Sequence, residues 1–229
     1  MQTDREREHQ GREPHDKSVP FPIPVRIPVF PLPNTVFFPK TYLPLHIFEP
    51  RYRQMVTDAA MGGQCIGMVL LKEGWESDYY GNPPIFSMGC VGRIVSVQPL
   101  VDGRSNILLQ GVERFEIQTE HFERPYREAS IKLAPHGAGG ELDPTVRSKL
   151  VRTLEEFLKS RDDGPTWQAL FRDEVSDDIL IHTLSTYLEC TPLEKQFLLE
   201  ADSLQQQARR LGDLLQFMMH DPHGAKGWG

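Results

Sequence analysis

Proline density is the feature that most restricts how this chain can fold. Nine of its 19 prolines lie between Pro20 and Pro50. Proline has no backbone N–H to donate to a sheet, and it is rarely found inside a central strand. The stretch from Ile27 to Ala60 is therefore expected to form short edge strands and bent strands, as at the rim of a small barrel, and no long flat sheet.

A helix is expected directly after the proline-rich strands. Pro50 suits the first helical position, because the N–H that it lacks would have no partner within the helix. The helix is expected to end at Gly62 and Gly63 and to plug or flank the barrel. Its apolar side chains recur at helical spacing: Tyr52, Met55, Val56 and Ala59.

Alternating and apolar runs predict the other strands. Asp102 and Gly103 predict a hairpin, because both residue types tolerate positive φ, and Gly111 is expected to break the returning strand. Residues 72–84 are expected to form a loop whose aromatic side chains either fold over the barrel or stay exposed for binding. The expected strands are residues 25–30, 43–48, 65–71, 89–97, 106–110, 112–119 and 127–133.

After residue 142 the hydrophobic period changes from that of strands to that of helices. Asp143 and Pro144 predict a helix start. Thr191 with Glu194 has the spacing of a capping box, and Ser203 with Gln206 repeats the device. The expected helices cover residues 144–158, 167–171, 175–188, 192–199 and 204–218.

The proline-rich stretch resembles a known family. Residues 27–32 (IPVFPL), 37–39 (FFP) and 43–52 (LPLHIFEPRY) are similar to the opening of the Lon protease N-terminal, substrate-binding domain, especially in its stand-alone bacterial form. Residues 108–117 (LLQGVERFEI) and the C-terminal helical segment resemble later parts of that domain. The resemblance implies a binding module with a PUA-like barrel and does not identify the bound molecule.

Together these patterns predict an α+β protein with a mostly antiparallel, proline-rich β-barrel, which the resemblance identifies as PUA-like, followed by a C-terminal α-helical bundle. The expected division is a disordered charged tail at residues 1–24, the barrel at 25–133, a glycine-rich linker at 134–142, the bundle at 143–220 and a flexible tail at 221–229. A chain of 229 residues is long enough for such a two-domain arrangement.

Charge and cysteine usage restrict the function. A formal net charge of −7 disfavours general nucleic-acid binding, which normally rests on a basic patch. Cys65, Cys90 and Cys190 form no C-x-x-C pair, so reduced thiols in a cytoplasmic protein are expected. No run is long enough to span a bilayer, and the first nineteen residues lack the apolar core of a signal peptide.

The sequence contains none of the common catalytic motifs. The sequence has no G-x-S-x-G elbow, H-E-x-x-H pair or Walker A loop, and it lacks the ATPase and Ser-Lys peptidase motifs of full-length Lon proteases. Ser148 and Lys149 are adjacent on a predicted helix and point in different directions. His220, Asp221 and His223 are the only dense group of possible metal ligands, and a frayed polar terminus explains them better. No enzyme, cofactor or metal site is predicted.

The function predicted from these observations is non-catalytic binding of unfolded protein or peptide segments, with a separate protease or chaperone as a further possible partner. An exposed strand edge at the junction of barrel and bundle would pair with an extended peptide, and apolar pockets would read its side chains. The candidate binding residues are Phe37, Phe38, Tyr42, Tyr52, Met55 and Met61, although core packing is an alternative role for each of them.

Two alternatives stay open at this stage. PUA-like barrels also occur in RNA-modifying proteins, so the chain is alternatively an RNA reader whose local basic face consists of Arg93, Arg104, Arg114, Arg124 and Arg127. A hydrolase of a kind without a recognised motif is the weaker alternative. Neither membranes nor a general nucleic-acid partner are expected.

Overall fold

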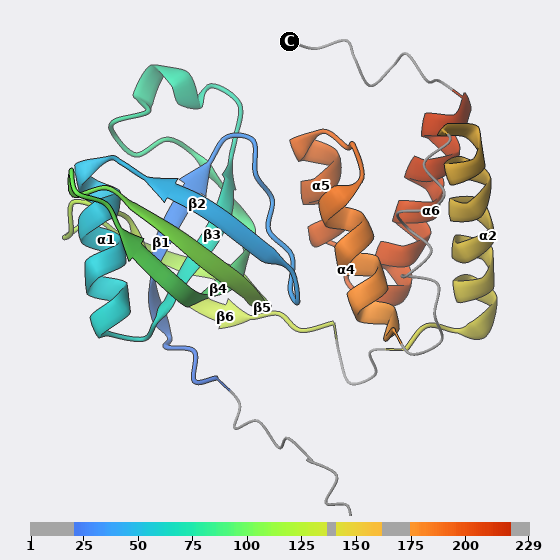
Figure 1. The fold of residues 1–229 in the computed structure, drawn as a ribbon, viewed down its shortest axis with the longest axis horizontal. Helices are drawn as coiled ribbons and strands as arrows, with labels where there is room; N and C mark the ends of the chain where they lie inside the picture. Colours follow the sequence, from blue (N-terminus) through green and yellow to red (C-terminus); the bar gives the residue numbers. More distant parts are fainter. Residues whose placement is uncertain (1–20, 137–140, 162–174, 221–229) are drawn as a thin grey trace, which may run out of the picture.

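The structure, a computed structural model, describes residues 21–136, 141–161 and 175–220. It combines a six-stranded sheet with several helices (Figure 1). Helix α1 lies on one side of the sheet, and the C-terminal helices gather on the other (Figure 1). Among the described residues, no helix has the length and apolar character needed to cross a bilayer.

The strands follow the predicted order with somewhat different ends. They are β1 (Arg26–Leu32), β2 (Tyr42–Ile47), β3 (Cys65–Leu71), β4 (Ile85–Pro99), β5 (Ser105–His121) and β6 (Glu128–Leu133). The helices are α1 (Pro50–Met61), α2 (Pro144–Arg161), α4 (Asp177–Tyr187), α5 (Pro192–Leu199) and α6 (Leu204–His220), with a short 3-10 helix at Trp75–Asp78. The predicted helix at residues 167–171 and the candidate metal ligands Asp221 and His223 lie outside the described residues.

The sheet closes on itself, but it is not a simple barrel. Its order is β2-β5-β4-β3-β1-β6, and the second half of β5 also pairs with β6. Five strands therefore form the closed part, while β2 pairs only with the first half of β5. The β1–β3 pair is parallel and the other pairs are antiparallel, so the mostly antiparallel arrangement is as predicted.

The expectation that Gly111 breaks the returning strand is wrong. β5 runs through it without interruption, and its backbone exchanges hydrogen bonds with the segment before β2: Gly111 N–H donates to the Thr41 carbonyl (2.9 Å), and Lys40 N–H donates to the Gly111 carbonyl (2.8 Å). A Cβ atom at this position would collide with the backbone carbonyl of Phe38. Glycine is present because another backbone passes close to it, and not because the strand ends.

Replacing Gly111 by alanine is therefore expected to lower the free energy of unfolding by about 1–3 kcal/mol, the usual cost of overpacking. Gly212→Ala is the matched control. The nearest atom to a Cβ there is 4.0 Å away, in ordinary contact, and alanine is favoured inside a helix by about 1 kcal/mol. Urea unfolding of both variants measures the difference. Equal stability of the two would contradict the close approach at Gly111.

The predicted helix starts are confirmed. Thr191 with Glu194 forms the complete capping box, whereas at Ser203 the Gln206 side chain accepts from the Asp202 N–H and not from the Ser203 N–H. Thr191 Oγ1 accepts a hydrogen bond from the Glu194 N–H, while the Glu194 carboxylate accepts from the Thr191 N–H. Ser203 Oγ accepts from the Gln206 N–H at the start of α6, and Asp143 Oδ1 accepts from the Thr145 N–H at the start of α2. These short-range signals are local, so the sequence alone positions the helix starts.

The sheet and the C-terminal helices share a packed junction. Val36, Phe38 and Leu70 belong to one buried cluster with apolar side chains of α2, α4, α5 and α6. Arg114 of β5 is only 3% exposed, and its Nη1 donates to the carbonyls of Leu199 (2.7 Å) and Ala201 (2.6 Å) at the end of α5. Side chains therefore fill the place where the sequence predicted a binding groove.

Candidate functional site

A groove runs beside α1, between that helix and the β4–β5 hairpin. We call it the α1–hairpin groove. Its volume is about 680 Å³. Helix α1 contributes Arg53, Thr57, Ala60 and Met61 to its lining. The hairpin contributes Val97 and Pro99 before its turn and Arg104 after it.

The helical repeat of α1 creates this groove. Tyr52, Met55, Val56 and Ala59 are buried against the sheet, which is the face that the sequence predicted. Positions 53, 57 and 61 are spaced by four, so their side chains share another face of the helix. Pro50 at the first helical position and Gly62 at the C-cap set the length of that face.

The hairpin supplies the opposite wall. Gly103 has φ of +81°, a left-handed conformation that glycine adopts at little cost, and the Arg53 guanidinium lies close over it. Arg104 is held by Asp102, with 2.6 Å between Nε and Oδ2. The Arg104 guanidinium also lowers the pKa of the Asp102 carboxyl to about 2. The hairpin tip is therefore fixed by charge pairing and by its turn.

The groove combines apolar surface with two cations. Met61 is 78% exposed and Val97 is 38% exposed, and both line the groove. A methionine side chain is flexible and polarizable, and it adapts to partners of different shape. Within the described part of the chain, the groove lining contains no histidine, cysteine or carboxylate. Its chemistry is that of a contact surface.

Strand β2 offers a free backbone edge next to the groove. Its last residue, Ile47, pairs with Ser105, which also lines the groove. Gly111 N–H donates to the Thr41 carbonyl, so the backbone groups of Thr41 face β5. In an antiparallel pair, successive residues face the partner strand and away from it in turn, so the backbone groups of Tyr42, Pro44 and His46 face away from β5. Pro44 has no N–H, so this edge offers few donors.

The structure does not bring the six candidate binding residues together on one surface. Phe37, Tyr52 and Met55 are buried in the cluster beneath α1, and Phe38 is buried in the junction cluster. Met61 lines the α1–hairpin groove. Tyr42 is half exposed on β2, where its hydroxyl accepts a hydrogen bond from Gln110. Binding by any of the six stays a prediction.

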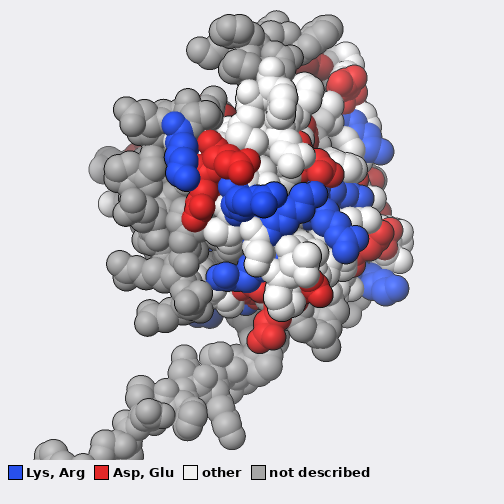
Figure 2. Space-filling view, turned by 90° about the vertical axis from the view of Figure 1, so that its right-hand side faces the viewer, with Lys and Arg blue, Asp and Glu red and all other residues white. Residues whose placement is uncertain are grey.

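The RNA-reader alternative is not favoured. Arg114 and Arg127 are buried, and Arg104 and Arg124 are paired with Asp102 and Asp58. The predicted arginines therefore form no continuous basic face. On the side of the molecule that carries α2 and α6, basic side chains are bordered by acidic ones (Figure 2).

No metal site emerges from the part of the chain that the structure describes: no group of three or more histidine, cysteine or acidic side chains has suitable geometry there. Cys65 and Cys90 are buried free thiols. Burial raises the pKa of the Cys65 thiol to about 11, which makes it a poor nucleophile near neutral pH.

Comparisons with known proteins identify the family of this chain. A family model for the substrate-binding domain of the ATP-dependent protease La (Lon) matches residues 26–216. The Lon protease of Flavobacterium johnsoniae is 31% identical over 191 residues, which cover 81% of this chain and 23% of that relative. The chain thus spans about a quarter of the length of that protein.

Two solved structures have the same fold. A Lon N-terminal domain protein from Xanthomonas campestris has a TM-score of 0.60 at 22% identity, covering 84% of this chain and 98% of the other. The N-terminal domain of the Mycobacterium avium complex Lon protease has a TM-score of 0.63 at 16% identity, covering 83% and 98%. With most of its length matched by the family model, this chain belongs to the Lon substrate-binding domain family.

Proposed function

We propose that this protein binds unfolded protein or peptide segments without catalysing a reaction on them, and that the α1–hairpin groove is where they bind. The observation that carries the proposal is the exposure of Met61 and Val97 on the two walls of one groove. Membership in a family defined by substrate binding supports the same class of ligand.

The groove has the chemistry that unfolded chains require. An unfolded segment exposes apolar side chains that folded proteins bury. When these side chains pack against the groove, the complex is stabilised by about 25 cal/mol for each Å² of apolar surface removed from water. Arg53 and Arg104 favour segments in which an acidic residue neighbours the apolar one. Selectivity for a particular sequence is expected to be low, because flexible methionine contacts adapt to their partner.

The free edge of β2 extends this proposed site. A peptide leaving the groove near Ser105 reaches the backbone groups of His46 and Tyr42 and can add to the sheet as a further strand. The missing N–H of Pro44 limits the number of hydrogen bonds. Apolar contact in the groove therefore supplies most of the affinity in this proposal, and the strand edge fixes the peptide's direction.

The proposal includes the finer assignments made from the sequence. These are a PUA-like character of the closed strands, a division into a β-rich part at residues 25–133 and a helical bundle at 143–220, and a cytoplasmic setting with a separate protease or chaperone as a partner. The shared cluster and the Arg114 contacts favour the two parts acting as one body.

Met61→Asp is expected to weaken binding of an unfolded polypeptide by about tenfold, which corresponds to roughly 1.4 kcal/mol. The loss arises because the variant places a charge where apolar surface would be covered. Fluorescence anisotropy with labelled, reduced and carboxymethylated α-lactalbumin measures the Kd. Leu193→Asp is the control, since it makes the same type of change at an exposed position of α5, away from the groove.

Two results would contradict the proposed site. The first is no saturable binding of the unfolded polypeptide at micromolar concentrations. The second is equal weakening by Met61→Asp and Leu193→Asp, because a contact confined to the groove is insensitive to a charge on α5. Circular dichroism of both variants verifies that the fold is retained.

A further inference from the structure

A second hollow lies at the N-terminal end of α1 and is lined by arginine and tyrosine side chains. Its volume is about 200 Å³, and we call it the arginine–tyrosine pocket. Most of its lining comes from the start of α1, the loop before β4 and the loop before β6, with Pro31 of β1 and Leu71 of β3 added. The lining residues that carry charge or aromatic rings include Arg51, Arg124, Arg127, Tyr79, Tyr80 and Tyr126.

The charge of this pocket differs from that of the whole chain. Among the residues that the structure describes, its lining contains three arginines and neither aspartate nor glutamate, although the formal net charge of the protein is −7. The carboxylates that pair with these arginines, Glu49, Asp58 and Glu120, are not among the lining residues. The guanidinium groups at the cavity wall are therefore paired with carboxylates that do not line it.

The Arg51 and Arg127 guanidinium groups are held in place before any ligand arrives. Arg51 Nε lies 3.1 Å from a Glu49 carboxylate oxygen, and Arg51 Nη2 donates to the Tyr79 carbonyl (3.1 Å). Arg127 Nη2 donates to the Pro83 carbonyl (2.8 Å), and Arg127 Nη1 lies 3.1 Å from a Glu120 oxygen. Fixed donors lose little side-chain entropy on binding.

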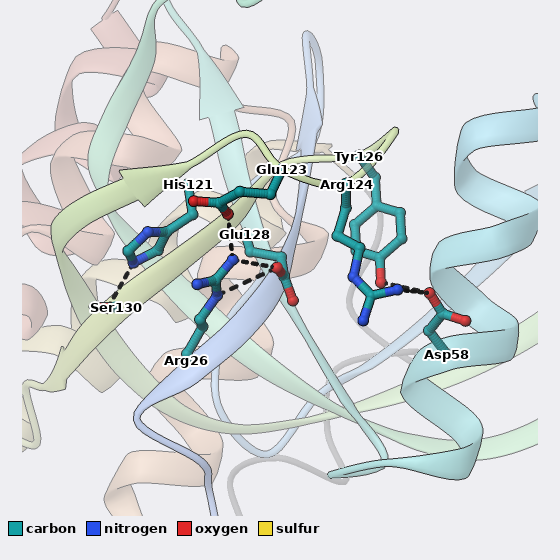
Figure 3. Close-up of polar contacts among 8 residues, drawn as sticks. All are labelled: Arg26, Asp58, His121, Glu123, Arg124, Tyr126, Glu128 and Ser130. Carbon is teal, nitrogen blue, oxygen red and sulfur yellow. Dashed lines mark hydrogen bonds and ion pairs between the residues drawn. The ribbon is translucent and has the colours of Figure 1, made fainter.

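The loop before β6 is fastened to α1 and β1. The Tyr126 hydroxyl donates to Asp58 Oδ2 (2.8 Å), and Arg124 Nη1 lies 3.6 Å from the same oxygen (Figure 3). Arg26 of β1 bridges Glu123 within this loop and Glu128 at the start of β6 (Figure 3). These contacts set the position of Arg124 at the pocket wall.

Arg127 is the most unusual of the three cations. Only 7% of the residue is exposed, and burial lowers the pKa of its guanidinium. A cation that has lost most of its water gains more from an additional anion than a solvated cation does. The open cavity beside Arg127 is where such an anion would lie.

Aromatic rings form the rest of the wall. The Arg51 guanidinium carbon lies 4.6 Å, 5.2 Å and 6.0 Å from the ring centres of Tyr52, Tyr79 and Tyr80. Tyr79 and Tyr80 also pack edge to face, with centroids 5.1 Å apart. The pocket thus offers planar donors and apolar ring surface within one small volume.

We infer that the arginine–tyrosine pocket binds the C-terminal carboxylate of an unfolded polypeptide together with the side chain of its last residue. A planar carboxylate matches the planar fork of a guanidinium. A C-terminal residue presents a carboxylate and an apolar or aromatic side chain from the same Cα atom. The carboxylate would contact the arginines, and the side chain would contact the tyrosine rings. An internal aspartate or glutamate presents only the carboxylate.

This inference rests on the proposed function and deepens it by naming the part of the chain that is recognised. Arg51 and Arg53 lie in the first turns of α1, where the pocket and the α1–hairpin groove lie on different sides of the same helix. In this arrangement the groove binds internal apolar segments of the unfolded polypeptide, and the pocket binds its C-terminal residue.

The test compares three forms of one labelled peptide that ends in phenylalanine: a free carboxylate, a C-terminal amide, and an amide with an internal phosphoserine. The free-acid form is expected to bind about tenfold or more tightly than the amide, because the amide loses the charge-assisted hydrogen bonds to the guanidinium groups. Arg127→Met and Arg124→Ala are expected to reduce this ratio towards one. Met61→Asp is expected to weaken both forms and to preserve the ratio.

The outcomes separate this inference from the proposed function. Equal binding of acid and amide by the unaltered protein overturns the carboxylate site and leaves peptide binding intact. Tighter binding of the phosphoserine peptide than of the free acid also overturns it, because the ligand is then a phosphate. Absence of binding by all three forms counts against both proposals. Arg124→Ala keeps the test decisive if Arg127→Met fails to fold, since the Arg124 side chain is half exposed.

Discussion

Arg114→Ala is expected to lower the free energy of unfolding by about 2–4 kcal/mol. The Arg114 side chain crosses from β5 to the end of α5, where Nη1 donates to the carbonyls of Leu199 and Ala201. Hydrogen bonds from a charged donor contribute roughly 1.5–3 kcal/mol each, and part of this gain is offset by the burial of the cation. Burial also lowers the pKa of this guanidinium.

Removing Arg114 leaves two carbonyl groups without their donor at the junction and opens a cavity between sheet and helices. Urea unfolding, followed by circular dichroism, measures the effect. Arg152→Ala is the matched control, because that side chain is 77% exposed and only weakly paired with Glu156, so a change within about 0.5 kcal/mol is expected. Similar values for both variants would show that the junction does not depend on Arg114.

Acid is expected to destabilise the protein through His182, by roughly 3 kcal/mol between pH 7 and about pH 4.5. His182 lies in the junction, where its ring stacks with those of His136 and Phe38 at centroid distances of 5.9 Å and 6.3 Å. Burial, followed by the nearby His136, lowers the pKa of His182 from 6.5 to about 3. The other charged groups that act on it are Asp178, Lys40 and Arg114.

The direction follows from proton uptake by the two states. Above about pH 6.5 neither the folded nor the unfolded chain protonates this histidine, so it adds no pH dependence. Between pH 6.5 and pH 3 the unfolded chain gains a proton that the folded chain does not bind. The free energy of unfolding therefore falls by about 1.4 kcal/mol per pH unit and levels off below pH 3.

His182→Phe separates this effect from the titration of carboxylates. Neither ring nitrogen of His182 has a hydrogen-bond partner among the described residues, and phenylalanine preserves the ring in the stack. The variant is expected to lose about 3 kcal/mol less than the unaltered protein over the same pH interval. Urea unfolding at both pH values measures the difference. Parallel pH profiles would contradict the assignment of acid sensitivity to His182.

Local signals made much of the fold predictable. Pro50, Gly62 and the apolar spacing of α1 defined that helix, and the Thr191–Glu194 capping box defined the start of α5. Asp102 and Gly103 located the hairpin. Each of these signals depends on residues within a few positions of one another, so it can be recognised from a single sequence.

Long-range relations were less predictable. Closure of the sheet depends on β6 pairing with both β1 and β5, and nothing local to β6 specifies two partners. Gly111 looked like a strand breaker because a single sequence does not reveal the Phe38 carbonyl that passes beside it. Arg114 looked like a surface cation because its partners lie about 85 residues away.

The candidate site was only partly predictable for the same reason. Of the six candidate residues, Met61 lines the α1–hairpin groove, and binding there stays a prediction. Val97 and Arg104 complete that groove from a hairpin some forty residues later, which only the fold brings close. The large side chains Phe37, Phe38 and Met55 suit a core as well as a ligand, and the structure buries them.

Hydrogen exchange of the protein with and without a saturating unfolded polypeptide tests the central claim most directly. Binding in the α1–hairpin groove predicts slower exchange of backbone amides in α1, at the start of β5 and along β2, with no change in α2 and α6. Slower exchange confined to α2 and α6, or unchanged exchange throughout at saturation, would contradict the assignment of the groove as the polypeptide-binding site.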